Sequence, residues 1–132
     1  MMHKRRAFLI GALLATLLGA ATAQAGERMP FDDAAFHAAQ EAGEPILVHV
    51  TAPWCGTCQA QKPIVARLAQ TPEFEGLTVF EVDFDSQKDV LREFGVRTQS
   101  TMIAFKGTSE IGRSVGDTEA TSIEALLRKV VS

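Results

Sequence analysis

The apolar residues of this chain change their spacing several times, which predicts a succession of strands and helices. Ile46 to Thr51 is almost continuously apolar, a pattern typical of a strand buried on both faces of a parallel sheet. A second such run predicts a strand from Leu77 to Asp83. Two more strands, Thr101 to Lys106 and Glu110 to Val115, are separated by only three residues, so we expect them to pair as a hairpin.

Helical spacing predicts four further segments. They run from Asp32 to about Ala42, from Cys55 to about Gln70, from Gln87 to Phe94, and from Thr118 or Thr121 toward the end of the chain. We expect Asp32, Ser86 and one of the two threonines to cap the first, third and fourth helices. The order of the elements predicts an α/β/α sandwich with a central mixed sheet of about four strands.

Residues 1–25 have the pattern of a bacterial export signal. Lys4-Arg5-Arg6 is a basic start, residues 7–21 are apolar and uncharged, and Ala23-Gln24-Ala25 is a cleavage site of small residues. We therefore expect a cleaved signal peptide over 1–25 and one domain over 26–132, periplasmic or secreted. The apolar stretch is shorter than the roughly 20 residues of a membrane span, so we expect no stable membrane insertion after cleavage. The paired arginines also fit the twin-arginine export route.

The net charge argues against a nucleic-acid partner. The chain has 13 basic and 16 acidic residues, and residues 1–25 contain three of the basic and none of the acidic ones, so the domain that remains carries −6. An acidic domain is a poor candidate for binding nucleic acid or an anionic membrane surface.

Both cysteines lie in the sequence Trp54-Cys55-Gly56-Thr57-Cys58, where the central strand gives way to a helix. At the start of a helix, unpaired backbone N–H groups and the helix dipole favour an anion, so the Cys55 thiol there loses its proton more easily. Cys58 lies one turn further on the same face and can attack a mixed disulfide formed on Cys55. Two cysteines in an exported chain can instead form a purely structural disulfide, but closing so short a loop stabilises little.

The chain resembles the thioredoxin family in this motif, in Pro63 five residues after the second cysteine, and in the segment Phe94-Gly95-Val96-Arg97. The resemblance covers roughly residues 31–131 and implies a thioredoxin-like α/β/α sandwich. It implies a thiol-disulfide oxidoreductase without a dissociable cofactor, in which Cys55 attacks and Cys58 resolves. The implied partners are proteins with disulfides or thiols, and a redox partner that regenerates the pair. We expect a monomer.

Three neighbours of the cysteines are expected to support them. Trp54 offers a flat aromatic surface for docking a substrate protein, or packs at the helix start. Gly56 and Thr57 lie between the cysteines, and Thr57 replaces the proline of many thioredoxins. Because the intervening pair tunes the redox potential in this family, the direction of electron flow is left open.

His49 lies six residues before Cys55, where thioredoxins place a buried aspartate that helps move the proton of the resolving cysteine. Two interpretations are open. His49 can accept that proton, and if it stays protonated it favours the thiolates. Alternatively it is a neutral core histidine bonded to a backbone carbonyl.

Ser100 takes the place of the cis-proline that precedes the threonine of the next strand in thioredoxins. A cis bond is costly without proline, so we expect Ser100 to be trans. We expect its hydroxyl and N–H to donate to the Cys55 thiolate. The loss of the ring also opens two alternative functions: a metal or iron-sulfur module with Cys55, Cys58 and His49 or a second chain as ligands, and a binding domain without turnover.

The remaining candidates for chemistry have simpler interpretations. His37 on the first helix is expected to be a solvated surface residue. The acidic residues of 81–89 lack the spacing of a calcium loop. We interpret them as solubilising charge and helix caps: Glu81, Asp83, Asp85 and Asp89.

Overall fold

The computed structural model describes residues 26–132, and the predicted signal peptide lies outside them. Within 26–132, none of the helices combines the length and the apolar character needed to cross a membrane.

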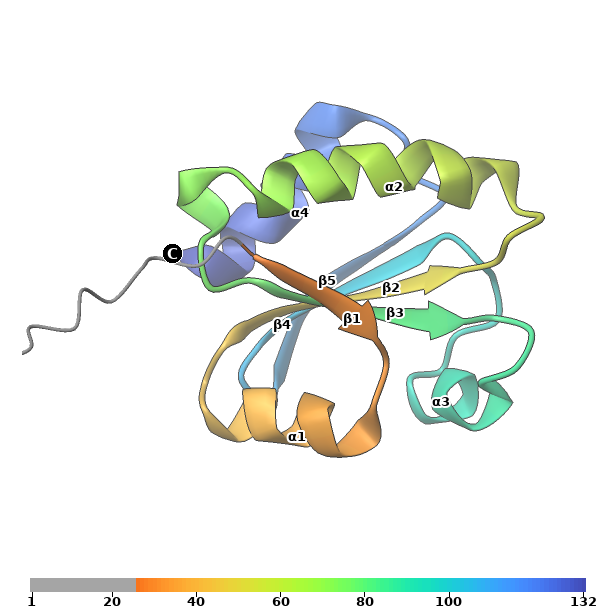
Figure 1. Ribbon diagram of the computed structural model, residues 1–132, viewed down its shortest axis with the longest axis horizontal. Helices are drawn as coiled ribbons and strands as arrows, with labels where there is room; N and C mark the ends of the chain where they lie inside the picture. The colour runs from red at the N-terminus through yellow and green to blue at the C-terminus, as the bar shows by residue number, and fades with distance from the viewer. Residues whose placement is uncertain (1–25) are drawn as a thin grey trace, which may run out of the picture.

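A mixed sheet of five strands forms the middle layer of the described part (Figure 1). Its strands are β1 (Glu27–Pro30), β2 (Pro45–Thr51), β3 (Thr78–Asp83), β4 (Thr101–Lys106) and β5 (Ser109–Val115). They lie in the order β1-β3-β2-β4-β5, in which β1, β3 and β2 are parallel to one another. Strand β4 runs antiparallel to β2, and β5 runs antiparallel to β4, as expected for the predicted hairpin.

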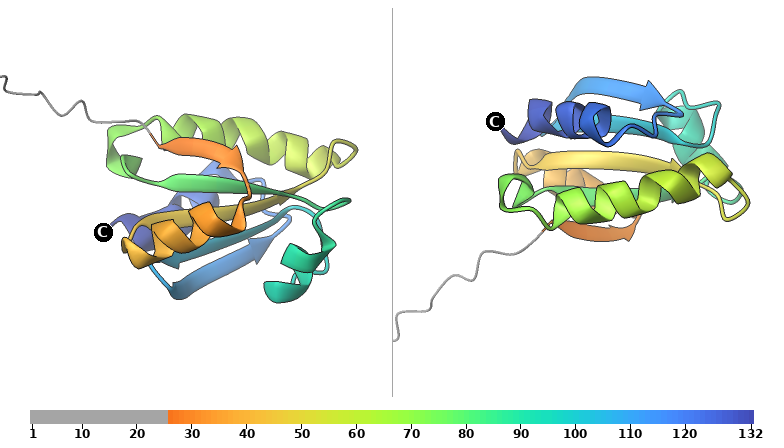
Figure 2. Two further views of the ribbon diagram at one scale, coloured as in Figure 1. Left: turned by 60° about the horizontal axis from the view of Figure 1, so that its bottom comes forward. Right: turned by 90° about the horizontal axis from the view of Figure 1, so that it is seen from above.

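Helices cover both faces of this sheet (Figures 1 and 2). One face carries α2 (Gly56–Ala69) and α4 (Ala120–Val131), and the other carries α1 (Asp33–Glu41) and α3 (Lys88–Glu93). A single 3₁₀ turn, η1 (Pro72–Phe74), links α2 to β3. The predicted thioredoxin-like sandwich is therefore confirmed, and the central strand β2 contributes side chains to both layers of core.

The two cores follow from the alternation of side chains along β2. Leu47 packs toward α2 and α4, together with the apolar stripe of α4 that the sequence predicts, Ile123, Leu126, Leu127 and Val130. Ile46, Val48 and Val50 face α1 and α3, among the rings of Phe31, Phe36, Phe80 and Phe105. His49 shares the face of Leu47, so it lies under α2.

The sheet has five strands where about four were expected, and the additional strand is β1. This strand has the sequence Glu-Arg-Met-Pro, lies at the edge of the sheet and shows no apolar run. Its position comes from pairing with β3, from Glu27 opposite Thr78 to Pro30 opposite Glu81, and from an ion pair between Arg28 and Glu81. Pro30 is acceptable here because an edge strand leaves one row of backbone groups unpaired.

Only one of the predicted caps is confirmed. Asp32 accepts a hydrogen bond from the N–H of Ala35 at 2.8 Å and caps α1. Ser86 is not the cap of α3, because Gln87 holds that position and makes no side-chain capping bond. The prediction for α4 is also wrong: Glu119 is its N-cap residue, and the side chain of Asp117 receives the N–H of Glu119 at 2.9 Å.

Candidate active site

The two cysteines lie where β2 ends and α2 begins, as a disulfide with its Cα atoms 5.2 Å apart. Cys55 is the N-cap residue of α2, and its Sγ accepts a hydrogen bond from the N–H of Cys58 at 3.1 Å. A sulfur at this position faces the orphan N–H groups of the first turn, which stabilise a thiolate once the pair is reduced. The predicted placement of Cys55 is therefore confirmed.

The two sulfur-bearing residues differ in their exposure. Cys55 is 5% exposed, whereas Cys58 is fully covered at 0%. The Sγ of Cys58 lies 3.8 Å from the carbonyl oxygen of Val50, the residue that follows His49 in β2. Cys55 is thus the less covered of the two cysteines, and Cys58 lies deeper.

Trp54 stands out from the surface beside Cys55, with 61% of its area exposed. Its Nε1–H donates to Asp85 at 2.8 Å, and its ring meets Phe84 edge to face at 6.3 Å between centroids. This bond holds the indole against the loop after β3. Its exposure fits a docking surface better than plain packing.

Gly56 and Thr57 occupy the first turn of α2 and are both exposed. A Cβ on Gly56 would meet nothing within 4 Å, so packing does not require glycine at this position. Both residues therefore belong to the surface that surrounds Cys55.

His49 is buried at 1% exposure, and its Nε2 lies 2.9 Å from Oε1 of Gln61. Burial lowers the pKa of His49 below 6.5, and the bond to Gln61 and the charge of Glu81 oppose this only in part. The ring is therefore neutral at neutral pH. This disfavours the idea that an imidazolium stabilises the thiolates, and the partner is a side chain rather than the expected backbone carbonyl.

Gln61 belongs to this site, although the sequence analysis did not single it out. It lies on α2 one turn after Cys58, is 0% exposed, and reaches two segments far away in sequence. Its Nε2 donates to the carbonyl oxygens of Ser100 at 3.1 Å and Asp117 at 2.9 Å. The available signal was a glutamine on the otherwise apolar inner face of a helix.

Ser100 is trans, as expected, and its backbone has a φ of 65°, which non-glycine residues rarely adopt. The expectation that Ser100 donates hydrogen bonds to Cys55 is wrong. The N–H donates to the carbonyl oxygen of Val50 at 2.9 Å, and the hydroxyl donates to the carbonyl oxygen of Gln99. Ser100 thus ties the loop before β4 to the end of β2, and it does not supply a donor to the thiolate.

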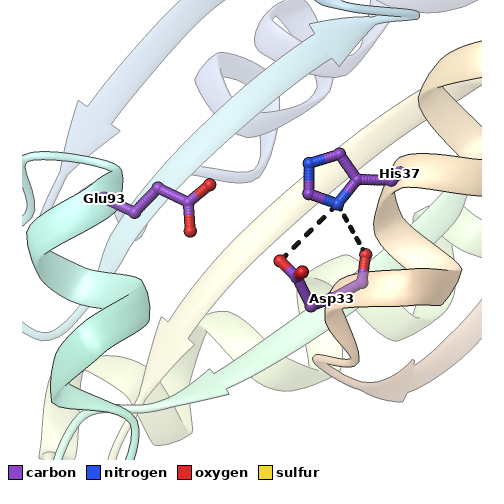
Figure 3. Close-up of side chains that lie close together, drawn as sticks. All are labelled: Asp33, His37 and Glu93. Atoms are coloured by element: carbon purple, nitrogen blue, oxygen red, sulfur yellow. Dashed lines mark hydrogen bonds and ion pairs between the residues drawn. The ribbon is translucent and has the colours of Figure 1, made fainter.

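Within residues 26–132, the ligand atoms of Cys55, Cys58 and His49 do not gather inside 4.8 Å of one another, whereas those of Asp33, His37 and Glu93 do. In that group, which is exposed on α1 and α3, His37 Nδ1–H donates to the carbonyl oxygen of Asp33 at 2.8 Å (Figure 3). His37 is therefore the surface residue that we expected.

The acidic residues after β3 serve local structure. Asp83 accepts the N–H groups of Asp85 and Ser86, which lowers the pKa of its carboxyl group. Asp89 pairs with Arg92. These contacts agree with the interpretation as solubilising charge, but the expected capping role is wrong: Asp83 closes a turn, and the N-cap residue of α3 is Gln87.

The sequence model of the thioredoxin family matches residues 28–129. The chain belongs to the thioredoxin family. It is accordingly a thiol-disulfide oxidoreductase, and its Cys55–Cys58 pair has the spacing and the helix-start position of a thioredoxin redox pair. Thioredoxins act on protein thiols and disulfides.

Thioredoxins of distant organisms are similar to it. A thioredoxin of Aspergillus fumigatus is 33% identical over 93 residues, which are 70% of this chain and 84% of that protein. Thioredoxin 1 of Nostoc sp. PCC 7120 is 35% identical over 86 residues, 64% of this chain and 78% of that one. The crystal structure of Trxlp from Edwardsiella tarda EIB202 superposes with a TM-score of 0.75 at 40% identity, covering 76% of this chain and 98% of the other.

Proposed function

We propose that this protein is an exported thioredoxin that exchanges disulfides in a bacterial envelope, either in the periplasm or outside the cell. The observation that carries the location is the basic start, uncharged apolar stretch and small-residue cleavage site of residues 1–25. The backbone N–H of Gly26 donates to the carbonyl oxygen of Ala69 at 2.7 Å. Cleavage after Ala25 would turn this N–H into an α-amino group, which can still donate to Ala69.

In the first step, the Cys55 thiolate attacks one sulfur of a substrate disulfide. A bond forms between Cys55 Sγ and that sulfur, and the other substrate sulfur leaves as a thiolate. The N–H of Cys58, which lies 3.1 Å from Cys55 Sγ, stabilises the attacking anion. Trp54 provides apolar contact area for the substrate beside the reacting sulfur.

In the second step, Cys58 resolves the mixed disulfide. Its thiol gives a proton to His49, and the resulting thiolate attacks Cys55 Sγ. The Cys55–Cys58 bond forms and the second substrate sulfur leaves, so two electrons pass from the cysteine pair to the substrate. His49 suits this role because it is buried and neutral when the proton arrives.

A redox partner then reduces the pair, and the same steps in reverse would oxidise a substrate. The position of this equilibrium depends on the reduction potential of the pair, which equilibration with a glutathione buffer measures directly. We propose that the protein works as a monomer. Size-exclusion chromatography with light scattering tests this state.

Export is tested by expressing the full chain in a bacterium, fractionating the cells and measuring the intact mass of the protein. We expect a periplasmic species that begins at Gly26. Replacing Arg5 and Arg6 together by lysine separates the two routes, because it blocks the twin-arginine pathway and leaves general secretion working. An uncleaved chain that stays in the cytoplasm would contradict the proposed location.

Catalysis is tested by turnover in the reduction of insulin disulfides by dithiothreitol. We expect the wild type to turn over many times, and Cys58→Ser to stop at a trapped mixed disulfide on Cys55. A protein that holds thiol substrates without turnover would instead be a binding domain. Metal analysis and absorbance of anaerobically purified protein test the metal alternative, in which iron or zinc would co-purify with the reduced cysteines.

A further inference from the structure

We propose that Gln61 is a positioning residue that holds His49 in the tautomer protonated on Nε2, which leaves Nδ1 free to accept the proton of Cys58. The inference rests on the proposed function, since it concerns the resolving step. It differs from the bare expectation that a histidine replaces an acidic base, because it assigns the reacting nitrogen and names the residue that selects it.

The orientation of the Gln61 amide follows from its two backbone partners. The carbonyl oxygens of Ser100 and Asp117 only accept hydrogen bonds, and they lie 3.1 and 2.9 Å from one amide atom of Gln61. That atom must be the NH₂ group, which has two hydrogens to donate. The Oε1 atom is therefore directed at His49, and turning the amide over would set it against two carbonyl oxygens.

The tautomer of His49 follows from this orientation. The Oε1 of Gln61 can only accept, so the Nε2 of His49, 2.9 Å away, must carry the hydrogen. A neutral imidazole has one protonated nitrogen, and Nδ1 is therefore the atom with the free lone pair. Within residues 26–132, Nδ1 of His49 is one of two buried side-chain polar atoms that have no hydrogen-bond partner.

An unpartnered buried acceptor is costly, and such atoms in a native fold call for a functional reason. Here the reason lies nearby. Val50 follows His49, and its carbonyl oxygen is 3.8 Å from Cys58 Sγ, while Gln61 is one helical turn after Cys58. The histidine is thus enclosed by the two elements that enclose the resolving sulfur. Proton transfer from Cys58 to Nδ1 directly, or through one water molecule, gives the nitrogen its missing partner.

The charges around His49 come from three elements. Glu81 of β3 is its register partner, Arg28 of β1 pairs with Glu81, and Lys62 follows Gln61 on α2. The neighbour on β4 is Met102, which carries no charge. Glu81 also borders an open pocket of about 260 Å³ that Lys62 and Asp83 line.

Cys58 S–H loses its proton to Nδ1, which makes His49 an imidazolium donating from both nitrogens. The Cys58 thiolate forms its bond to Cys55 Sγ, and the substrate thiolate that leaves takes a proton from solvent. His49 then returns one proton to solvent and is neutral again, so the net transfer is from Cys58 to the released substrate thiol.

The test follows the two steps separately with one equivalent of 5,5′-dithiobis(2-nitrobenzoate) and reduced full-length protein. Release of the first thionitrobenzoate reports attack by Cys55, and release of the second reports resolution by Cys58. We expect Gln61→Glu to pair with a protonated His49, which then cannot accept a proton at neutral pH. Resolution should slow by about 10²-fold and recover at higher pH, whereas attack should change little.

Nuclear magnetic resonance of ¹⁵N-labelled protein reads the tautomer without using activity. We expect the hydrogen of His49 on Nε2 in the wild type and a mixture of tautomers in Gln61→Leu. Gln70→Leu, at the exposed C-cap residue that follows α2, is the matched control and should change neither readout. If Gln61→Leu does not fold, His49→Gln replaces it in the kinetic experiment. Resolution by Cys58 should then be slow at every pH.

A wild-type His49 protonated on Nδ1 would overturn the inference, and so would a Gln61→Glu variant whose resolution slows equally at every pH. Both results are compatible with the proposed oxidoreductase function. Failure of the wild type to turn over insulin disulfides would instead contradict the proposed function, while the tautomer would still report on Gln61.

Discussion

The N–H of Ser100 donates to the carbonyl oxygen of Val50 at 2.9 Å, and the Sγ of Cys58 lies 3.8 Å from that same oxygen. The loop that precedes β4 is therefore fastened to the strand that carries the active site through one backbone bond. A proline at position 100 would lack this N–H. It would also prefer a φ near −65°, whereas Ser100 has a φ of 65°.

We expect Ser100→Pro to lower the free energy of unfolding by about 1 to 3 kcal/mol, because the carbonyl of Val50 loses its donor in a buried site. Ser100→Gly is the control: glycine keeps the N–H and adopts a positive φ without strain, so the change should stay within about 1 kcal/mol. Urea unfolding of the oxidised proteins measures both. A proline variant as stable as the wild type would mean that the loop rebuilds around the ring.

The buried His49 should make stability depend on pH. Its pKa in the folded protein lies below the ordinary value of 6.5, so the unfolded chain binds more protons between these two pKa values. The contribution of His49 to the free energy of unfolding is therefore fully present above pH 6.5. It is lost as the pH falls toward the folded pKa, by up to about 1.4 kcal/mol per pH unit. Denaturant midpoints at a series of pH values measure this slope.

His49→Gln removes the titrating group and should flatten the slope, whereas replacing the exposed His37 by glutamine should leave it as it is. If the wild type and His49→Gln lost stability in parallel on acidification, the dependence would come from other groups.

The exposure of the cysteines predicts which thiol reacts first. After reduction, brief treatment with iodoacetamide at neutral pH should label Cys55 and spare Cys58, because Cys58 is fully covered whereas Cys55 keeps 5% exposure and lies at the start of α2. Peptide mass mapping identifies the labelled site, and protein unfolded in guanidinium should label at both. Preferential labelling of Cys58 would reverse the roles assigned to the two cysteines.

The bond from Trp54 to Asp85 should matter for protein substrates. Asp85→Ala removes the acceptor 2.8 Å from Nε1 and frees the indole. If the oriented indole contributes about 1 kcal/mol to the binding of a protein substrate, its release should raise the KM for insulin roughly five-fold. The reaction with a small disulfide should stay unchanged. The emission of Trp54, the one tryptophan of the chain, should shift in the same variant. Asp89→Ala, on the exposed surface of α3, is the control, and equal effects of both variants would contradict a specific role for the bond.

Local signals in the sequence were sufficient for most of the fold. The apolar run of β2, the stripe of α4 and the cap at Asp32 each arise from residues close together in the chain, where spacing alone decides which side chains share a face. The position of Cys55 at the start of α2 was predictable for the same reason. The edge strand β1 was not, because its order comes from pairing with β3 rather than from its own four residues, three of which are exposed.

The sequence by itself determined the two-layered core, the redox pair and the presence of a histidine beneath it. The tertiary structure alone decided what the polar groups of the site do. Gln61 joins His49, Ser100 and Asp117 across separations of 12, 39 and 56 residues, and Ser100 donates to Val50 rather than to Cys55. Hydrogen bonds are short and directional, so their partners depend on how distant segments meet after folding, whereas apolar burial depends mainly on which face a residue occupies.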